Sequence, residues 1–402
     1  GRELDSIVQG VGRALAMGVG VVGGGGCGSL GVVRPAVWAE LGASRGDTTL
    51  AYSLLTVGFG RGGVVMGRIT DRWGFAVAAA LGAALISSGY IASAHAGALW
   101  QVALAHGLLI GPGAAATLGP LIVDVSQWFR RRRGAAVALA ASGNYFAGAA
   151  WPPVVQYFMS QEGWRGAYLF IGIFCLVAMP ALILMVRRRR DDQEAHLSPL
   201  ADGDAGRPLG LKPNVLMALI CVAGVACCVA MAMPQVHIVA YCSDLGYGVA
   251  RGAEMLSLML VFGIVSRILF GFVADRIGGL RTLLLSSALQ AVALVFYMFF
   301  DGLTSLYVVS ALFGLFQGGI VPSYAIIIRE YFPAKEAGGR VGLVIMATLF
   351  GMALGGWMSG AIFDLTGSYL VAFANGVLWN LLNMSIAAML LWRPWREKPV
   401  MA

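Results

Sequence analysis

Charged residues are scarce in this chain. Asp, Glu, Lys and Arg make up only 12% of its 402 residues, about half the roughly 25% typical of soluble domains. Hydrophobic residues make up 58% and the mean hydropathy is +0.78. A soluble protein of this size has too much surface to leave so few charges for water. The composition therefore excludes an ordinary soluble enzyme and a disordered chain, and it indicates an integral membrane protein.

Motifs for covalent chemistry are also missing. The chain contains no P-loop of the form G-x-x-x-x-G-K-[ST], so ATP hydrolysis is not indicated. Its six cysteines form no C-x-x-C pair and no metal-binding spacing, and they fall mainly within apolar runs, where Cys acts as a small buried hydrophobe. We therefore expect a protein that is not an enzyme, with no cofactor and no metal.

Long apolar runs dominate what is present. They do not alternate as barrel strands do, and they have the length of about 20 residues that a membrane-spanning helix needs. The predicted spans lie near 14–38, 49–67, 75–95, 98–128, 134–160, 165–186, 214–242, 252–274, 280–300, 303–328, 339–363 and 368–392. We expect an all-α membrane protein with twelve transmembrane helices in two pseudo-symmetric six-helix halves, 1–190 and 213–402, joined by a cytoplasmic linker, 191–212.

The positions of the cations predict the orientation. With the N-terminus in the cytoplasm, 22 of the 28 Lys and Arg residues fall on the cytoplasmic side, and only Arg45, Arg165 and Arg251 lie outside. The positive-inside rule predicts this asymmetry. We therefore expect both termini in the cytoplasm, a location in the cell (inner) membrane, and no nucleic-acid partner for the net charge of +8.

An internal repeat supports the division into halves. The pattern G-x-x-x-D-R-x-G occurs at 67–74, after the second predicted span, and at 271–278, after the eighth. Parallel repeats of this kind are a transporter architecture. We expect the Asp–Arg pairs to latch neighbouring helix ends. The candidate gating residues are Gly67, Asp71, Arg72, Gly271, Asp275, Arg276 and, as a latch partner at the end of the fourth span, Asp124.

With these motifs the sequence resembles the major facilitator superfamily. Further stretches narrow the resemblance to its monocarboxylate-porter-like branch, which includes bacterial oxalate/formate-type antiporters. They are Trp128-Phe129-Arg130, Gly163-Trp164-Arg165, Glu330-Tyr331-Phe332-Pro333 and Asp364-Leu365-Thr366-Gly367-Ser368-Tyr369. The resemblance implies secondary transport of small carboxylates, with a proton or by exchange, through rocking of two six-helix halves.

Arg267 is the principal candidate for substrate binding. It lies eight residues before Asp275, about 12 Å along the helix axis from the cytoplasmic end and so near the middle of the membrane. A charge at that depth is costly and is normally kept for function, and a guanidinium can bind a carboxylate with two parallel hydrogen bonds. The resemblance implies that an arginine of the eighth helix binds the substrate carboxylate, and Arg267 matches that position.

Several other residues are candidates for the same cavity, each with a structural alternative. Arg61 could pair with carbonyls or another helix, Arg34 could extend to the outer interface, and the remaining candidates could be packing residues. His237 and Tyr241 share one face of the seventh span after Pro234, and histidine could relay a proton. The remaining candidates are Asn144, Tyr145 and Tyr324.

Two departures from the family pattern bear on the substrate. Gly263 stands where animal members carry an acid one turn before the arginine, and the eleventh span lacks the lysine of oxalate-type exchangers. The sequence predicts a transporter of small organic anions, chiefly monocarboxylates resembling lactate or pyruvate. A dicarboxylate exchanger using Arg61, an efflux transporter of drugs or hydrophobic compounds, and a membrane sensor or channel stay as alternatives. Expected partners are the anion, protons and membrane lipids, and the expected state is a monomer.

Overall fold

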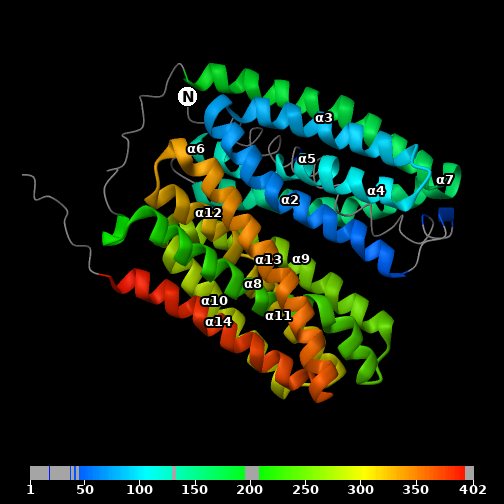
Figure 1. Cartoon of the computed structure of the whole chain (residues 1–402). Helices are drawn as coiled ribbons and strands as arrows, with labels where there is room; N and C mark the ends of the chain where they lie inside the picture. Colours follow the sequence, from blue (N-terminus) through cyan, green and yellow to red (C-terminus); the bar gives the residue numbers. More distant parts are fainter. Residues whose placement is uncertain are drawn as a thin grey trace, which may run out of the picture. The chain divides into compact units, whose positions relative to one another are not determined.

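The computed structural model describes residues 18, 37, 40–41, 45–128, 133–194 and 208–393. Within those ranges every regular element is a helix (Figure 1). Nine of the helical segments in the described part are long and apolar enough to cross a membrane.

The N-terminal helices include one interrupted span. The elements are α2 (Arg45–Trp73), α3 (Phe75–Ala94), α4 (Leu99–Ala105), η1 (His106–Ile110), α5 (Gly111–Ala115), α6 (Gly119–Trp128) and α7 (Arg133–Glu194). The segment η1 is a π-helical turn, and a turn at 116–118 separates α5 from α6, so the α-helix of the predicted fourth span is interrupted at two places. Short π-helical turns inside α-helices are frequent at functional sites.

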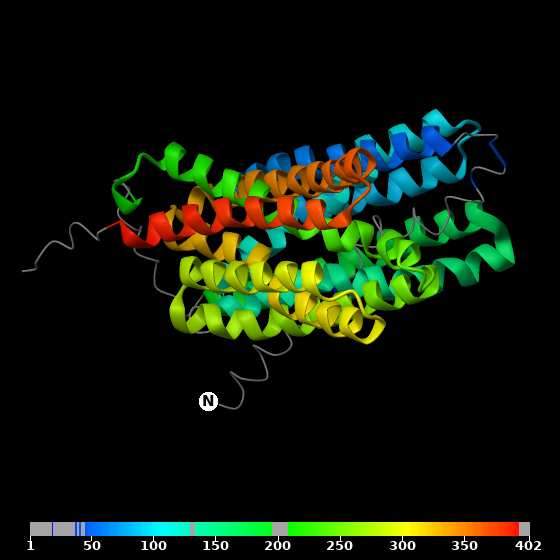
Figure 2. The same ribbon diagram turned by 90° about the horizontal axis from the view of Figure 1, so that it is seen from below.

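The C-terminal helices are mostly longer. The elements are η2 (Pro208–Gly210), α8 (Pro213–Asp244), α9 (Val249–Ile277), α10 (Gly279–Phe299), α11 (Leu303–Gln317), α12 (Ile320–Tyr331), η3 (Ala334–Glu336), α13 (Ala337–Thr366) and α14 (Tyr369–Trp392). The predicted tenth span is interrupted at Gly318 and Gly319, between α11 and α12. Figure 2 shows α10 and α14 lying side by side.

The helices agree closely with the hydropathy of the sequence. Eleven of the twelve predicted spans coincide with helices in the described part of the chain, and most of the first span, 14–38, lies outside it. The fifth and sixth spans form the two arms of α7, which bends at Gly163 (φ 72°, ψ −178°). That backbone conformation is accessible essentially to glycine alone, so Gly163 marks the turn between the two spans.

The chain forms two compact units. The first comprises Gly1–Phe129, Leu139–Ala201 and Lys335–Met346, and the second comprises Arg130–Ala138, Asp202–Ala334 and Ala347–Ala402. Each unit takes one short stretch from the part of the sequence that forms most of the other unit. The first turns of α7 belong to the second unit, and the first turns of α13 belong to the first unit.

Glycine allows close helix packing inside each unit. In the first unit, a Cβ at Gly62 would lie 2.8 Å from the Cβ of Pro112 in α5. In the second unit, Gly314 of α11 lies so close to α9 that a Cβ would overlap the carbonyl group of Met259. Small residues at helix contacts are the usual means by which membrane helices approach closely.

We predict that Gly314→Ala destabilises the protein, whereas Gly97→Ala does not. The added methyl group at 314 meets the backbone of α9, and such overpacking costs about 1–3 kcal/mol. A Cβ at Gly97 has nothing within 4 Å. Thermal unfolding of the purified variants in detergent measures the difference, and equal midpoints for the two variants would contradict the close contact of α9 and α11.

Candidate functional site

The aspartate of the first repeated motif binds the start of a distant helix. Asp71, near the end of α2, accepts hydrogen bonds from the N–H groups of Gly338 at 2.7 Å and Gly339 at 2.8 Å. Both donors lie in the first turn of α13, where backbone N–H groups have no partner within the helix. The carboxylate also faces the positive end of the helix dipole. Asp71 therefore satisfies backbone N–H groups in the first turn of α13 and places a negative charge beside them.

The glycines of the first motif make this contact possible. A Cβ at Gly67 would overlap the carbonyl group of Gly338, and a Cβ at Gly338 would overlap that of Gly67. The last glycine of the motif, Gly74, has φ 85° and ψ 166° and turns the chain from α2 into α3. Only glycine reaches this conformation without strain. The motif thus combines a close contact, a carboxylate cap and a tight turn.

The second motif repeats the arrangement in the second unit. Asp275 of α9 accepts hydrogen bonds from the N–H groups of Gly134 and, at 3.1 Å, Ala135, in the first turn of α7. A Cβ at Gly271 would lie 2.8 Å from the carbonyl oxygen of Gly134. Gly278 has φ 83° at the turn into α10. Each copy of the motif therefore caps the helix that begins the fifth span of the other half of the sequence.

The arginines of both motifs are exposed. Arg72 is exposed, with its guanidinium 5.1 Å from the ring centre of the neighbouring Trp73. Arg276 is also exposed, and Asp124 is buried within α6. The contacts that join the helix ends come from the aspartates and the glycines.

Sequence reasoning missed a third carboxylate cap. Glu330, at the end of α12, accepts hydrogen bonds from the N–H group of Gly279 through both of its carboxylate oxygens, at 3.0 and 3.2 Å. Gly279 is the first residue of α10. Glu330 belongs to the quoted Glu330-Tyr331-Phe332-Pro333 stretch, but nothing in that stretch indicates which helix start the carboxylate meets.

Arg267 lies beside the interruption of the tenth span. It is half-buried on α9, one turn after Gly263. Residues Gly263, Ser266 and Phe270 of α9 face Gln317, Gly318 and Gly319, respectively, at the junction of α11 and α12. Substrate sites of transporters typically lie at such interrupted helices. The arginine therefore adjoins a place where the backbone is not regular helix.

Arg61, unlike Arg267, lies on an exposed face of its helix. It is exposed on α2, on the same face as Val57 and Val65, which are 51% and 54% exposed. The equivalent position in the second half, Val265, is likewise exposed. The position equivalent to Arg267 is Gly63, which is buried. The two arginines thus occupy non-equivalent positions in the two halves of the sequence.

The candidates on α8 contact other helices of the second unit. The Nε2 atom of His237 lies 2.9 Å from the carbonyl oxygen of Gly356 in α13; because a carbonyl can only accept, we assign the proton to Nε2. Tyr241, one turn later, packs edge-on against the rings of Tyr369 and Phe373. These contacts join α8 to α13 and α14.

Tyr324 belongs to a buried polar network. Its hydroxyl donates to Oδ1 of Asn383 at 3.1 Å, and Nδ2 of Asn383 donates to Oγ of Ser287 at 2.7 Å. The network joins α12, α14 and α10, and the Tyr324 hydroxyl has its hydrogen-bond partner within it. Arg34 lies outside the described residues, as do the side chains of Asn144 and Tyr145, whose backbone belongs to α7.

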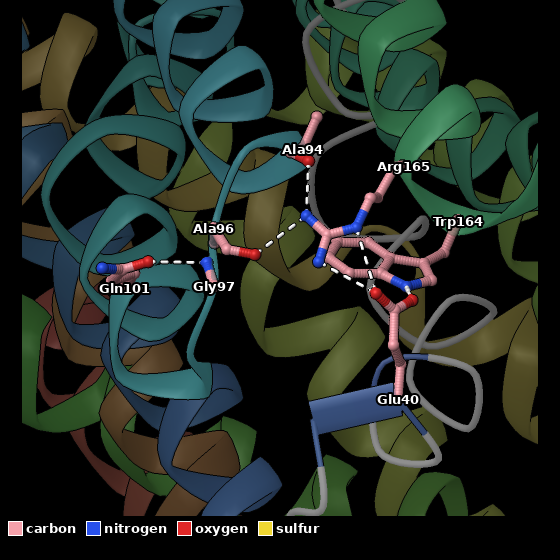
Figure 3. Close-up of polar contacts among 7 residues, drawn as sticks. All are labelled: Glu40, Ala94, Ala96, Gly97, Gln101, Trp164 and Arg165. Carbon is pink, nitrogen blue, oxygen red and sulfur yellow. Dashed lines mark hydrogen bonds and ion pairs between the residues drawn. The ribbon is translucent and has the colours of Figure 1, made fainter.

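An ion-pair cluster ties together three segments of the first unit. Arg165, just after the bend in α7, donates to the carbonyl oxygens of Ala94 and Ala96, both at 2.8 Å, and forms an ion pair with Glu40 at 2.9 Å (Figure 3). The indole N–H of Trp164 donates to the other oxygen of Glu40. We call these three side chains, Glu40, Trp164 and Arg165, the outer clamp.

A buried aromatic cluster that sequence reasoning also missed adjoins the outer clamp. Trp164 packs edge-on against Tyr168, whose hydroxyl lies 3.3 Å from Nε2 of His106 in the π-helical turn η1. Nδ1 of His106 lies 2.8 Å from the carbonyl oxygen of Val102. The bond to this carbonyl places the proton on Nδ1 and leaves Nε2 to accept from Tyr168. His106 is completely buried.

Comparison with known proteins agrees with this architecture. The sequence profile of the Major Facilitator Superfamily matches residues 16–305 and 218–400. Monocarboxylate transporter 13 of Bos taurus is 28% identical over 316 residues, which is 78% of this chain and 72% of the relative. Monocarboxylate transporter 11 of Mus musculus is 27% identical over 360 residues, 86% of this chain and 79% of the relative.

The solved structures establish the fold. A variant of the E. coli fucose:proton symporter superposes with a TM-score of 0.72 at 12% identity, over 94% of this chain and 98% of that protein. At this level of identity the likeness concerns the fold alone. The expectation of an all-α major facilitator fold is therefore confirmed, and the relatives belong to a family of transporters rather than enzymes.

We predict that the contribution of the outer clamp to stability depends on pH. Hydrogen bonds from Trp164 and Arg165 hold the pKa of the Glu40 carboxyl below its ordinary value of 4.5. Because folding lowers this pKa, the contribution is complete above about pH 4.5 and is lost as the pH falls through the lower folded-state value.

Thermal unfolding of the wild type and of Glu40→Gln between pH 7 and pH 3 tests this. The difference between their midpoints should shrink as the pH falls below about 4.5, the ordinary value. Glu162→Gln, which changes an exposed carboxylate on α7 outside the clamp, is the matched control. A midpoint difference for Glu40→Gln that does not change with pH would show that the charge of Glu40 plays no part.

Proposed function

Because the chain belongs to the Major Facilitator Superfamily, we propose that this multi-pass membrane protein is a secondary transporter of small organic anions. Its preferred substrates are monocarboxylates of the lactate and pyruvate kind. We further propose that it resides in the inner membrane with both termini in the cytoplasm, because 22 of its 28 cations fall on one side of the predicted spans.

One observation carries the choice of substrate: the half-buried charge of Arg267 beside the interrupted tenth span. A permanent positive charge at membrane depth is costly unless a partner or a ligand offsets the cost. A planar guanidinium matches the two oxygens of a carboxylate. The similarity to relatives named monocarboxylate transporters supports the same substrate class.

The capped helix starts suit a cytoplasmic latch. Asp71 and Asp275 each hold the first turn of a long helix through two backbone N–H groups. If the protein works by alternating access, contacts of this kind must release in one state and form again in another. We propose that the two motifs stabilise one state of the cycle and so set its equilibrium.

The alternatives fit these observations less well. An oxalate-type dicarboxylate exchanger needs a second cation for its second carboxylate, and the candidate for that role, Arg61, shares an exposed face of α2 with the apolar residues Val57 and Val65. Efflux of cationic drugs is disfavoured because Arg267 would repel them. Transport could be coupled to protons or proceed by exchange, and an imposed pH gradient distinguishes the two.

We predict that Arg267→Lys lowers uptake of the best organic acid about tenfold or more. Lysine keeps the charge but loses the paired hydrogen bonds. A hydrogen bond to a charged group contributes about 1.5–3 kcal/mol, and about 1.4 kcal/mol corresponds to a factor of ten. Counterflow into proteoliposomes, with a panel of labelled mono- and dicarboxylates, measures the effect.

Arg393→Lys is the matched control, because Arg393 is exposed just after α14 and lies outside both motifs, and it should retain uptake. Full uptake by Arg267→Lys would disprove the carboxylate-binding role. Uptake that rises with an inward proton gradient would favour symport, whereas uptake that ignores the gradient and requires internal anion would favour exchange.

A further inference from the structure

We infer that Gln317 and Ser266 recognise a polar group next to the substrate carboxylate. The inference rests on the proposed function and gives these two residues a role in it: they favour acids that, like lactate and pyruvate, carry a hydroxyl or keto oxygen on the carbon next to the carboxylate. These are 2-hydroxy and 2-oxo monocarboxylates, in contrast to the unsubstituted acids of the same length.

Gln317 is the most unusual polar side chain of the second unit. It is 1% exposed, yet neither its amide oxygen nor its amide nitrogen has a hydrogen-bond partner within the part of the chain that the structure describes. Leaving a buried amide without partners costs free energy, and nearly all buried polar groups in proteins avoid this cost. An amide with both ends unpaired is therefore better explained by a ligand than by packing.

Ser266 is a second such group on the facing helix. It is completely buried, and its hydroxyl also lacks a partner among the described residues. Gln317 ends α11, and the next residue, Gly318, lies so close to Ser266 that a Cβ there would be 2.8 Å from the serine oxygen. The two unpaired groups thus meet at the same short stretch of the interrupted span.

Their position relative to Arg267 gives the site its chemistry. Ser266 directly precedes Arg267 in the chain. Gly263, one turn before Arg267, faces Gln317, and a Cβ there would lie 3.7 Å from its Nε2 atom. Arg267 therefore lies on the same face of α9 as Gly263, which faces the unpaired amide, and it directly follows the residue that carries the unpaired hydroxyl. Together the amide and the hydroxyl offer donors and acceptors.

This set of groups matches a substituted acid. With the carboxylate on Arg267, a 2-hydroxyl group can donate to Oε1 of Gln317 or accept from its Nε2, and a keto oxygen can accept from Nε2 or from the serine hydroxyl. An unsubstituted acid leaves the buried polar groups unpaired, and sites built to bind a hydroxyl discriminate against such analogues.

The test compares lactate with propionate, which differ only by the 2-hydroxyl group. Both labelled acids are offered together to the same proteoliposomes, so that the uptake ratio does not depend on the amount of active protein. The wild type should prefer lactate. Gln317→Leu should lower the lactate-to-propionate ratio about tenfold, as expected for loss of a hydrogen bond to a buried group.

Three further variants keep the test independent of folding. Ser266→Ala should also lower the ratio, and it removes only one oxygen atom. Gly263→Ala should fold, since its methyl group would be in ordinary contact with the amide. Gln290→Leu is the matched control: Gln290 is equally buried, but it lies on α10 and its Nε2 atom donates to the carbonyl oxygen of Cys227 at 3.4 Å, so the ratio should not change.

The outcomes separate this inference from the proposed function. If the wild type transports both acids in an Arg267-dependent manner, and the ratio is the same in Gln317→Leu and Ser266→Ala, then Gln317 and Ser266 are structural and the inference is overturned while the proposed function stands. If the wild type transports neither acid, the proposed function fails and the inference fails with it. A lower ratio in both variants, with Gln290→Leu unchanged, supports the inference.

Discussion

The start of a membrane helix has backbone N–H groups that no residue of the same helix can satisfy, and the rest of this structure depends on how that need is met. Asp71 meets it for α13 and Asp275 for α7, each with both carboxylate oxygens. Glu330 does the same for α10. A carboxylate is the best acceptor for these groups, because it also offsets the positive end of the helix dipole.

The other features of the repeated motif follow from this interaction. The cap forms only if the helices come close, and Gly67 and Gly271 lie where any side chain would prevent the approach. The cap joins segments 267 residues apart in one case and about 140 in the other. The first turn of α13 therefore belongs to the first unit, and the first turn of α7 belongs to the second unit.

Hydropathy and glycine spacing predicted most of this fold, whereas the partners of the polar residues could not be predicted. A run of apolar residues determines its own span locally, and the repeat identified Asp71 and Asp275 as helix-end residues. Their acceptor role toward Gly338 and Gly134 depends on contacts between distant segments. For the same reason His106 and Gln317 gave no signal, since a single polar residue in an apolar run does not reveal what faces it. Arg267 stood out because a charge in the middle of an apolar span is rare in itself.

Hydrogen exchange at the capped amides tests the central claim most directly. In the wild type the amides of Gly338 and Gly339, and those of Gly134 and Ala135, should exchange slowly. Asp71→Asn should accelerate exchange at the first pair about tenfold or more and leave the second pair unchanged, and Asp275→Asn should do the reverse. Unchanged exchange at the first pair in Asp71→Asn and at the second pair in Asp275→Asn would contradict the account that these carboxylates hold the two helix starts.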